Sequence, residues 1–409
     1  MATCRFCEST LTDKFLSLGK TPLANSYLTD ETLGKMEPFY PLELYVCREC
    51  YLVQLLEFEN PIKIFSIYAY FSSYSTSWVN HARQYAEHMV DTYHFTRESL
   101  VVELGSNDGY LLQFFKNNGV PVLGIEPAEN IAHIAIEKGI PTEVAFFSRE
   151  YSEHIRAEHQ PADLIIGNNI LAHVPDLNDF VAGMANLLGD SGIITMEFPH
   201  LLKLMELNQF DTIYHEHFSY FSLLAAVNVF RRHGLEIFDV EELSTHGGSL
   251  RIYAKHRGDD AHPVQPSVDN LLQNEKQSGL DRLDYYYDFG HKVRRIKREI
   301  QRFFLETKSE GKSIAGYGAP AKGNTLLNYC GIDTDYIDYT VDLNPYKQNR
   351  YLPGANIPIF HPDHIRETQP DFVFILPWNL KDEIMEQMHF IREWGGQFVL
   401  PIPRIEIMS

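Results

Sequence analysis

From Leu100 onward, short apolar runs alternate with helix-like segments, and this rhythm restricts the possible fold more than any other feature. The runs LVVELG, PVLGIEP, ADLIIGNN and GIITMEF are typical of buried strands, and the segments between them have helical spacing. Further along, LEIFDVEEL and LRIYAKH flank STHGGS and predict an antiparallel hairpin that closes the sheet. We therefore predict a doubly wound α/β domain over roughly residues 66–255.

Two other regions flank this domain, as expected for a chain of 409 residues, which exceeds the usual size of one domain. Residues 1–65 contain two cysteine pairs and short strands such as LELYVC. The polar, proline-containing stretch HRGDDAHPVQPS marks the next boundary, and a long amphipathic helix follows it. From SIAGYG onward, strands and helices alternate again. Residues 256–409 are therefore predicted to form a second, smaller α/β domain of Rossmann-like type.

Four of the five cysteines form two CxxC pairs, Cys4/Cys7 and Cys47/Cys50. Each pair can present two thiolates from one tight turn, and two such turns complete a tetrahedral sulfur site for zinc. Disulfides are the alternative, but a reducing cytoplasm disfavours them. Because four sulfur ligands leave no position for water, we expect the zinc to be structural.

Charge narrows the range of partners. The formal net charge of −20 argues against nucleic acid and anionic membranes. The N-terminal residues show no signal-peptide pattern, and no run approaches the roughly 20 apolar residues of a membrane span. We expect a cytoplasmic protein with a small-molecule partner, in which helix N-termini and a few cations bind any anionic ligand.

The turn ELGSNDG lies between a predicted strand and a predicted helix, where Gly105 and Gly109 allow a ligand to approach the backbone. Glu126 ends the next strand about twenty residues later, a position from which a carboxylate can bind ribose hydroxyls. Asn107 replaces the middle glycine of a dinucleotide motif, which favours an adenosine ligand without phosphates, namely S-adenosylmethionine (SAM). Asp108 is either a ligand contact or a helix N-cap. An ordinary α/β turn without a ligand is the alternative.

Other polar residues are expected at the same sheet edge. Asn168 and Asn169 end the third strand, and His173 follows them before Pro175. Loops beyond the carboxyl ends of strands form the ligand crevice of an open α/β sheet. His173 is a candidate site residue, with a structural role as the alternative.

The segment FDTIYHEHFSYF carries Tyr214, His215, Glu216 and His217 in succession. A metal site would need further ligands, and no HExxH spacing supplies them. A structural hydrogen-bond network is possible. Because the segment follows the strand GIITMEF, we expect it to overhang the same sheet edge as Gly105, which favours acid–base chemistry.

The glycine-rich turn GYGAPAKGN opens the C-terminal unit, and with Lys322 its helix N-terminus is a candidate diphosphate site. Lys347 and Arg350 add positive charge in a later loop. An ordinary glycine-rich turn is the alternative. His246 in STHGGS is a second candidate for contact with substrate, although its glycine neighbours are also explained by the hairpin turn.

Over nearly its whole length, the chain resembles one family. The motifs that carry this resemblance are, in order, the two CxxC pairs, YAYFSS, ELGSNDG, NNILAHVP, FDTIYHEHFSYFS, HGGS, GYGAPAKGN and DLNPYKQNRYLPGANIP. This family is the sugar C-methyltransferases that act on C-3 of nucleotide-linked 4-keto-deoxysugars. The resemblance implies a zinc-binding N-terminal domain, a central SAM-binding domain and a C-terminal Rossmann-like domain. It also implies that the nucleotide sugar is held between the last two.

The resemblance also assigns site residues. The family's active-site residues fall on Tyr68, His173, Tyr214, Glu216 and His217. Residues expected to contact SAM are Tyr70, Ser73, Glu103, Gly105, Asn107, Gly109, Glu126, Pro127, Asn168 and Asn169. Residues expected to contact the nucleotide sugar are His246, Tyr317, Lys322, Asn324, Lys347 and Arg350.

The expected chemistry begins with the ketone at C-4, which acidifies the proton on C-3. We expect His217 to remove this proton, with Glu216 orienting the imidazole. Tyr214, Tyr68 or His173 would stabilise the enolate oxygen. A sugar O- or N-methyltransferase and a non-catalytic binding protein are the alternatives. The sequence leaves open the nucleotide base, the sugar's other substituents and the oligomeric state.

Overall fold

The computed structural model describes residues 2–60 and 71–408, and it divides into two compact units built from separate parts of the chain. Unit 1 contains Met1–Thr12, Cys47–Leu201 and Phe218–Asp281. Unit 2 contains Asp13–Val46, Leu202–His217 and Arg282–Ser409. The domain boundaries expected near residues 65 and 255 stay predictions.

Unit 1 is built on a seven-stranded sheet in the order β10-β11-β8-β7-β4-β5-β6. The strands are β4 (Val101–Leu104), β5 (Val122–Ile125), β6 (Thr142–Glu143), β7 (Ala162–Asn168), β8 (Leu188–Pro199), β10 (Leu235–Leu243) and β11 (Ser249–His256). Strands β8, β7, β4, β5 and β6 run parallel, whereas β11 is antiparallel to both β8 and β10. The mixed α/β class and the closing hairpin are therefore confirmed.

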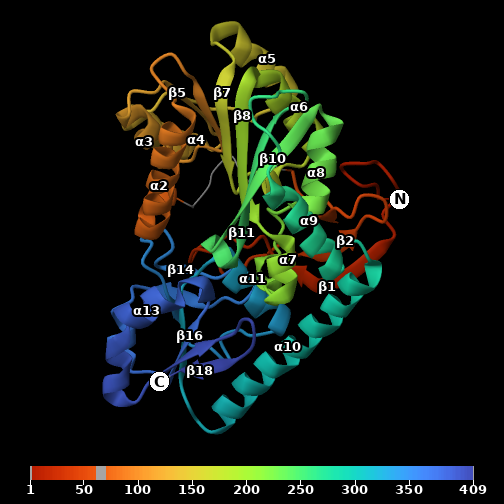
Figure 1. The fold of residues 1–409 in the computed structure, drawn as a ribbon. Helices are drawn as coiled ribbons and strands as arrows, with labels where there is room; N and C mark the ends of the chain where they lie inside the picture. Colours follow the sequence, from red (N-terminus) through yellow and green to blue (C-terminus); the bar gives the residue numbers. More distant parts are fainter. Residues whose placement is uncertain (1, 61–70, 409) are drawn as a thin grey trace. The chain divides into compact units, whose positions relative to one another are not determined.

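Helices cover both faces of this sheet, which explains why its central strands are apolar throughout rather than alternating. In Figure 1, α2 and α3 lie on one face, whereas α6 and α8 lie on the other. The helices are α2 (Thr76–Tyr93), α3 (Leu112–Asn117), α4 (Glu129–Glu137), α5 (Arg149–Glu158), α6 (Leu177–Leu187), α8 (Leu223–Arg232) and α9 (Pro266–Ser278). Short 3-10 turns are η1 (Ser72–Tyr74), η2 (Leu171–His173) and η4 (Thr245–Gly247). Outside the main sheet, β3 (Val53–Leu55) pairs with β9 (Ser219–Tyr220).

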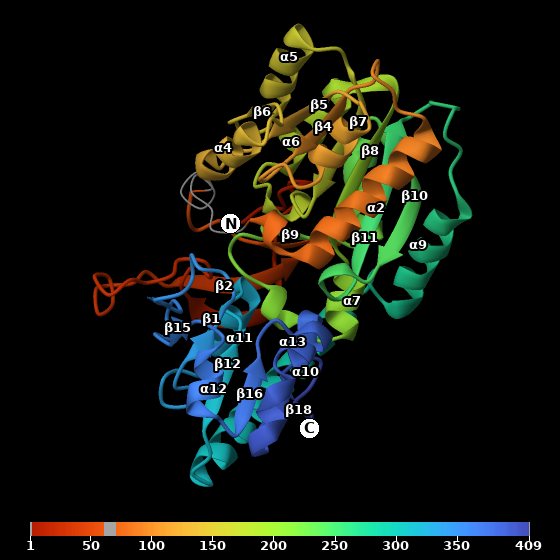
Figure 2. The ribbon, with the colours of Figure 1, turned by 90° about the vertical axis from the view of Figure 1, so that its left-hand side faces the viewer.

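Unit 2 contains a second seven-stranded sheet in the order β14-β15-β13-β12-β16-β17-β18. The strands are β12 (Ile314–Tyr317), β13 (Thr340–Val341), β14 (Arg350–Tyr351), β15 (Pro358–Phe360), β16 (Phe372–Ile375), β17 (Gln397–Leu400) and β18 (Glu406–Met408). Its five inner strands run parallel, and the two edge strands are antiparallel to their neighbours. Strands β12 and β16 lie side by side, as Figure 2 shows. The helices of the C-terminal part are α10 (Leu283–Ser309), α11 (Ala321–Cys330), α12 (His364–Thr368) and α13 (Lys381–Gln387), with 3-10 turns η5 (Trp378–Leu380) and η6 (His389–Trp394).

An N-terminal hairpin, β1 (Asp13–Thr21) and β2 (Tyr40–Val46), also belongs to unit 2 because it packs on the long helix α10. The ring centroids of Phe15 and Tyr286 are 5.3 Å apart. A Cβ atom on Gly290 would lie 2.4 Å from the Phe15 carbonyl oxygen, so only glycine permits this approach. Residues predicted as part of one N-terminal domain are thus divided between the two units.

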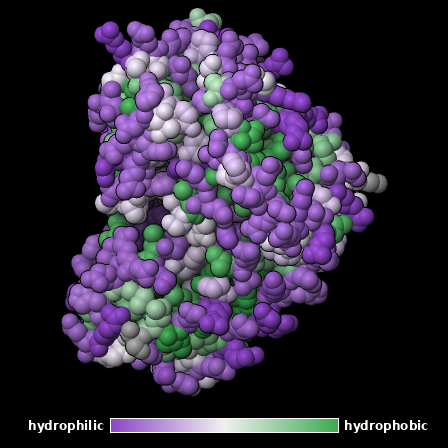
Figure 3. Space-filling view, in the orientation of Figure 1, coloured by the Kyte–Doolittle hydropathy of each residue, from purple (hydrophilic) through white to green (hydrophobic). Residues whose placement is uncertain are grey.

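The chain crosses between the units twice around the Tyr-His-Glu-His segment. Helix α7 (Leu201–Glu206) leaves unit 1, the turn η3 (Phe210–Thr212) follows, and the chain returns at Phe218. On the face shown in Figure 3, hydrophilic residues predominate and hydrophobic ones are scattered. Within the described part of the chain, no helix combines the length and the apolar character needed to cross a membrane.

Candidate functional site: a sulfur cluster, a cofactor crevice and a histidine segment

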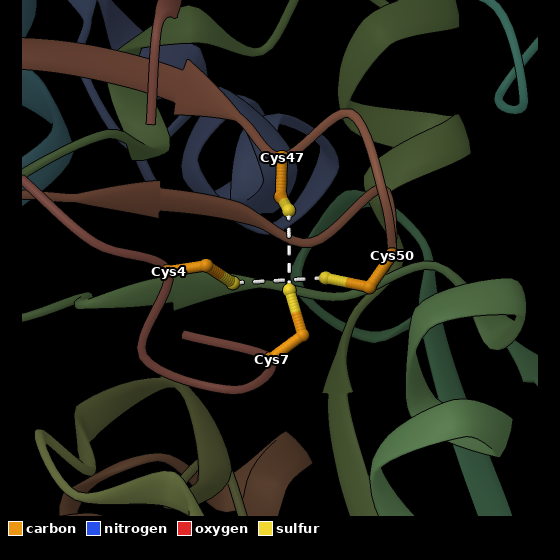
Figure 4. Close-up of side chains that lie close together, drawn as sticks. All are labelled: Cys4, Cys7, Cys47 and Cys50. Atoms are coloured by element: carbon orange, nitrogen blue, oxygen red, sulfur yellow. Dashed lines mark hydrogen bonds between the residues drawn. The ribbon is translucent and has the colours of Figure 1, made fainter. Parts of the chain in front are cut away.

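The four N-terminal cysteines converge on one point within unit 1 (Figure 4). All four sulfurs lie within 4.8 Å of one another, with Cys4 and Cys50 3.6 Å apart and Cys7 and Cys47 3.4 Å apart. Four sulfurs bound to zinc at about 2.3 Å would be separated by similar distances. The donor set and its spacing therefore fit a structural zinc ion.

Backbone turns and hydrogen-bond donors support this cluster. Each CxxC pair is followed by a residue with positive φ, Glu8 at 65° and Tyr51 at 58°, which folds the chain back toward the sulfurs. Gln54 Nε2 donates to Cys4 Sγ at 3.2 Å. The Ser9 hydroxyl oxygen lies 3.1 Å from Cys47 Sγ. Such donors stabilise thiolates that bind a metal.

Arg5, between the first two cysteines, ties the sulfur cluster to the rest of unit 1. Its guanidinium donates to the carbonyl oxygens of Pro175 at 2.8 Å and Leu55 at 2.7 Å. It also lies over the ring of Phe218, 5.4 Å from the centroid. The cluster thus holds the loop that follows His173.

The predicted SAM turn, between β4 and α3, has the backbone conformation that its residue types allow. Gly105, Asn107 and Gly109 have φ values of 67°, 49° and 75°. A Cβ atom on Gly105 would lie 3.0 Å from the Ile170 side chain, and one on Gly109 would lie 2.9 Å from Ile140. The turn therefore depends on glycine at two positions, and Asn107 occupies the left-handed region that asparagine tolerates.

Three acidic side chains surround this turn. Glu126 accepts hydrogen bonds from the backbone N–H groups of Asn107 and Ala128, both at 2.9 Å. Burial raises the pKa of Glu126 to about 7, although these two hydrogen bonds oppose the shift. Burial also raises the pKa of Glu103 well above its usual range, as do the nearby carboxylates of Glu126 and Asp108. Buried carboxyl groups of this kind suit a ligand that carries positive charge and ribose hydroxyls, as SAM does.

The other described residues that we expect to contact SAM also lie in unit 1. Asn168 Nδ2 donates to the Tyr110 hydroxyl at 3.3 Å. Asn169 has a φ of 57° and donates its N–H to the Glu197 carbonyl oxygen at 2.7 Å. The Ser73 hydroxyl accepts from Lys138 at 3.1 Å, and Pro127 follows Glu126 directly. Tyr70 and the predicted catalytic Tyr68 lie outside the described residues.

His173 ends the turn η2 in unit 1 and is half-buried there. Burial lowers the pKa of its imidazole to about 4, so the ring is neutral at pH 7. Phe218 donates its N–H to the carbonyl oxygen of Ala172 at 2.7 Å. A neutral imidazole can still donate one hydrogen bond to a developing oxyanion.

A buried charged cluster in unit 1 was not predicted from the sequence. Glu197 near the end of β8 has a fully buried side chain and lies 2.8 Å from His81 Nε2. It also accepts from Arg251 at 2.7 Å and from Thr245 at 2.9 Å. Burial alone would raise the pKa of Glu197, but these partners lower it to about 2. A glutamate inside the apolar run GIITMEF was the signal that could have revealed this cluster.

The same region holds His246, which the sequence suggested as a substrate contact. Its ring meets the Trp78 ring edge-on, with centroids 4.9 Å apart, and His81 stacks on Trp78 at 5.1 Å. The backbone of His246 has a φ of 54°. Its contact with substrate stays a prediction.

In unit 2, the segment Tyr214–His217 is packed closely. The ring centroids of Tyr214 and His217 are 4.1 Å apart, and His217 Nδ1 lies 3.1 Å from the Thr212 carbonyl oxygen. His215 Nε2 lies 3.2 Å from the Pro41 carbonyl oxygen. Burial lowers the pKa of His215.

A carbonyl oxygen only accepts hydrogen bonds, so its contact with His217 Nδ1 determines which nitrogen carries the proton. Nδ1 holds the hydrogen of the neutral ring, and the lone pair lies on Nε2. The imidazole is thus oriented through Thr212, whereas its orientation by Glu216 stays a prediction. Glu216 accepts a hydrogen bond from Asn25 Nδ2 at 2.7 Å, a partner that the sequence did not suggest.

The predicted substrate residues of unit 2 surround the glycine-rich turn between β12 and α11. Lys322 donates to Asn379 Oδ1 at 2.6 Å, and burial lowers its pKa to about 8. Lys347 donates to the Ala319 carbonyl oxygen at 2.9 Å, and Arg350 is exposed. The Tyr317 hydroxyl donates to Gln387 at 3.0 Å, and Asn324 is buried in α11. Both lysines already have protein partners, so their contact with a diphosphate stays a prediction.

The SAM turn and His173 fall in unit 1, whereas Tyr214, Glu216 and His217 fall in unit 2. The expected convergence of these groups over one sheet edge therefore stays a prediction.

Comparisons with known proteins agree with the chemistry of these parts. Three family models match the chain: a "zinc binding domain" over residues 4–65, a "Methyltransferase domain" over 80–240 and a "C-methyltransferase C-terminal domain" over 244–403. The C-methyltransferase NovU of Streptomyces niveus is 37% identical over 406 residues, which cover 99% of this chain and 96% of NovU.

Solved methyltransferases match only part of the chain. Magnesium protoporphyrin IX methyltransferase of Synechocystis with bound S-adenosylhomocysteine (SAH) is 16% identical and has a TM-score of 0.35, covering 44% of this chain and 83% of that one. The CcbJ methyltransferase of Streptomyces caelestis is 12% identical with a TM-score of 0.34, covering 43% and 90%. By contrast, the match to NovU spans almost the whole of both chains. The zinc-binding and methyltransferase models match successive parts of this chain. With its cofactors SAM and zinc, this chain belongs to the SAM-dependent C-methyltransferase family.

Proposed function

We propose that the enzyme transfers the methyl group of SAM to C-3 of a nucleotide-linked 4-keto-deoxysugar through an enolate. The observation that carries this proposal is the contact of His217 Nδ1 with the Thr212 carbonyl oxygen at 3.1 Å, from which the tautomer of the neutral ring follows. The resulting lone pair on Nε2 suits a general base. The ketone at C-4 supplies the activation that makes the C-3 proton removable.

SAM, when bound at the turn of unit 1, supplies an electrophilic methyl group. Its charge and ribose suit Glu103 and Glu126, as their burial and raised pKa values suggest. The chain's own residues perform the remaining tasks. His217 takes the proton, and Tyr214 or neutral His173 would donate a hydrogen bond to the enolate oxygen. Tyr68 is proposed to share this task.

The nucleotide diphosphate is proposed to bind at the N-terminus of α11. The backbone N–H groups there and the positive φ of Gly318, 86°, suit close approach of an anion. Lys322 would exchange its hydrogen bond with Asn379 for one to phosphate, and Lys347 or Arg350 would add charge. A cytoplasmic location suits the four thiolates, which stay reduced there.

The test uses the His217→Asn variant with a panel of 4-keto sugar nucleotides. Loss of a general base should lower turnover by about 10²- to 10⁴-fold, while SAM still binds by calorimetry. Exchange of the C-3 proton for deuterium without SAM should fall in parallel. His215→Asn is the matched control, because His215 contacts the Pro41 carbonyl oxygen and has no proposed role as base.

Product analysis separates the possible reactions. Mass spectrometry should show a gain of about fourteen daltons, and NMR should place the new methyl group on carbon. A methyl group on oxygen or nitrogen would instead indicate an O- or N-methyltransferase. If His217→Asn retains full turnover, His217 is not the base.

A further inference from the structure

In unit 2, a series of hydrogen bonds reaches Glu216 from the N-terminal segment between β1 and β2. Asn25 Nδ2 donates to Glu216 Oε1 at 2.7 Å, across 191 positions of sequence. The Tyr27 hydroxyl lies 3.3 Å from Asn25 Oδ1 and donates to the Ala319 carbonyl oxygen at 2.6 Å. The series therefore links the carboxylate to the glycine-rich turn.

The contact between Asn25 and Glu216 lies among buried side chains. Glu216 is only 3% exposed and Tyr27 only 9%. The oxygens of a carboxyl group with so little water around it need hydrogen-bond donors from the protein. An amide nitrogen can only donate, so Asn25 supplies a hydrogen bond to Glu216 Oε1 and fixes the direction of that atom.

Asn25 is itself held in place through Tyr27 and the glycine-rich turn. Lys347 donates to the same Ala319 carbonyl oxygen at 2.9 Å and lies 3.5 Å from Asp342. Asp342 accepts from the N–H of Ala319 at 2.7 Å. These contacts hold Ala319 in place, and its carbonyl oxygen fixes the Tyr27 hydroxyl. Tyr27 in turn limits the positions that the Asn25 side chain can adopt.

We propose that Asn25 is a positioning residue for Glu216, and that Tyr27 supports it from the glycine-rich turn. This inference rests on the proposed function, in which Glu216 acts beside the base His217. It gives the segment between β1 and β2 a direct part in the reaction. It also explains why Lys347, expected to contact substrate, is engaged within the protein.

The test compares Asn25→Ala and the isosteric Asn25→Asp. Loss of a hydrogen bond to a charged group should lower kcat by about 10- to 100-fold. The KM values for SAM and nucleotide sugar should change less than about twofold. Asn25→Asp should be at least as impaired, because it places a second carboxylate beside Glu216. Asn117→Asp on the exposed face of α3 makes the same charge change and should retain activity.

Two further measurements distinguish positioning from general stability. With substrate deuterated at C-3, the isotope effect on kcat should rise in Asn25→Ala as proton removal slows. In a Glu216→Gln background, adding Asn25→Ala should lower kcat by less than about twofold, because its partner is already changed. Should the Asn25 variants fail to fold, Tyr27→Phe keeps the ring and should lower kcat by about 3- to 10-fold.

The outcomes separate the two proposals. Full activity of Glu216→Gln would overturn the role of Glu216 and the inference with it. An inactive Glu216→Gln together with fully active, folded Asn25→Ala would overturn the inference alone. Additive losses in the double variant would likewise show that Asn25 acts elsewhere.

Discussion

The raised pKa of Glu126 should make the affinity for SAM depend on pH. Burial raises this pKa to about 7 in the free protein. In the proposed complex, ribose hydroxyls donate to the ionised carboxylate of Glu126, so binding of SAM should favour loss of the proton. Protonated Glu126 must lose its proton before it can accept these hydrogen bonds. This requirement multiplies the dissociation constant of SAM by about eleven at pH 6 and by about 1.1 at pH 8. We expect SAM to bind about tenfold more weakly at pH 6 than at pH 8.

Calorimetry at pH 6, 7 and 8, in buffers with different ionisation enthalpies, measures both the affinity and the proton released. The neighbouring carboxyl group of Glu103, whose pKa is also raised, titrates in the same sense, and SAM has its own amino group. The Glu126→Gln variant separates these contributions and should lose most of the tenfold change. Glu129→Gln, an exposed change in the first turn of α4, should retain it. A dissociation constant that stays flat in the unaltered enzyme, or the same slope in Glu126→Gln, would refute the reasoning.

Three further changes test the structure. Cys47→Ser should abolish stoichiometric binding of zinc, measured by elemental analysis, and should speed amide hydrogen exchange in the loop after η2. Zinc retained by this variant would contradict the four-sulfur site. Gly109→Ala should lower the free energy of unfolding by about 1–3 kcal/mol in urea titrations, because Gly109 has a positive φ and its new Cβ would meet Ile140. Gly119 also has a positive φ, 77°, but open space around it, so Gly119→Ala should cost less. Glu197→Gln leaves the buried Arg251 with Glu241 as its remaining carboxylate partner and should cost about 3 kcal/mol by the same assay. A neutral result would show that solvent reaches the pair.

Much of the architecture could be predicted because its signals are local. Apolar runs of four to seven residues became β4, β5 and β7, buried on both faces. Two CxxC pairs separated by a long interval came together because each turn presents its sulfurs independently of the chain between them. The turn around Asn107 could also be anticipated, since the left-handed region limits the residues that fit.

Other contacts have no local signature. Asn25 is one polar residue in an irregular segment, and nothing near it indicates a partner 191 positions away. Lys347 was expected to bind an anion because a basic residue in a loop carries no information about internal acceptors such as Ala319. The sequence also predicts that the β1–β2 region forms strands, but their packing partner depends on surface shape. Gly290, which admits the Phe15 carbonyl, is a glycine within a helix whose meaning emerges only in three dimensions.

The packing of the first hairpin on α10 has a consequence for biosynthesis. The Tyr287 hydroxyl donates to Asp13 at 2.8 Å, across 274 positions. At roughly 5–20 residues per second, a ribosome needs roughly 14–55 s to synthesise this interval. The newly made hairpin must wait all that time with its apolar side uncovered. Nascent chains of this enzyme should therefore engage chaperones early and release them only when the tyrosine-rich start of the long helix has left the exit tunnel.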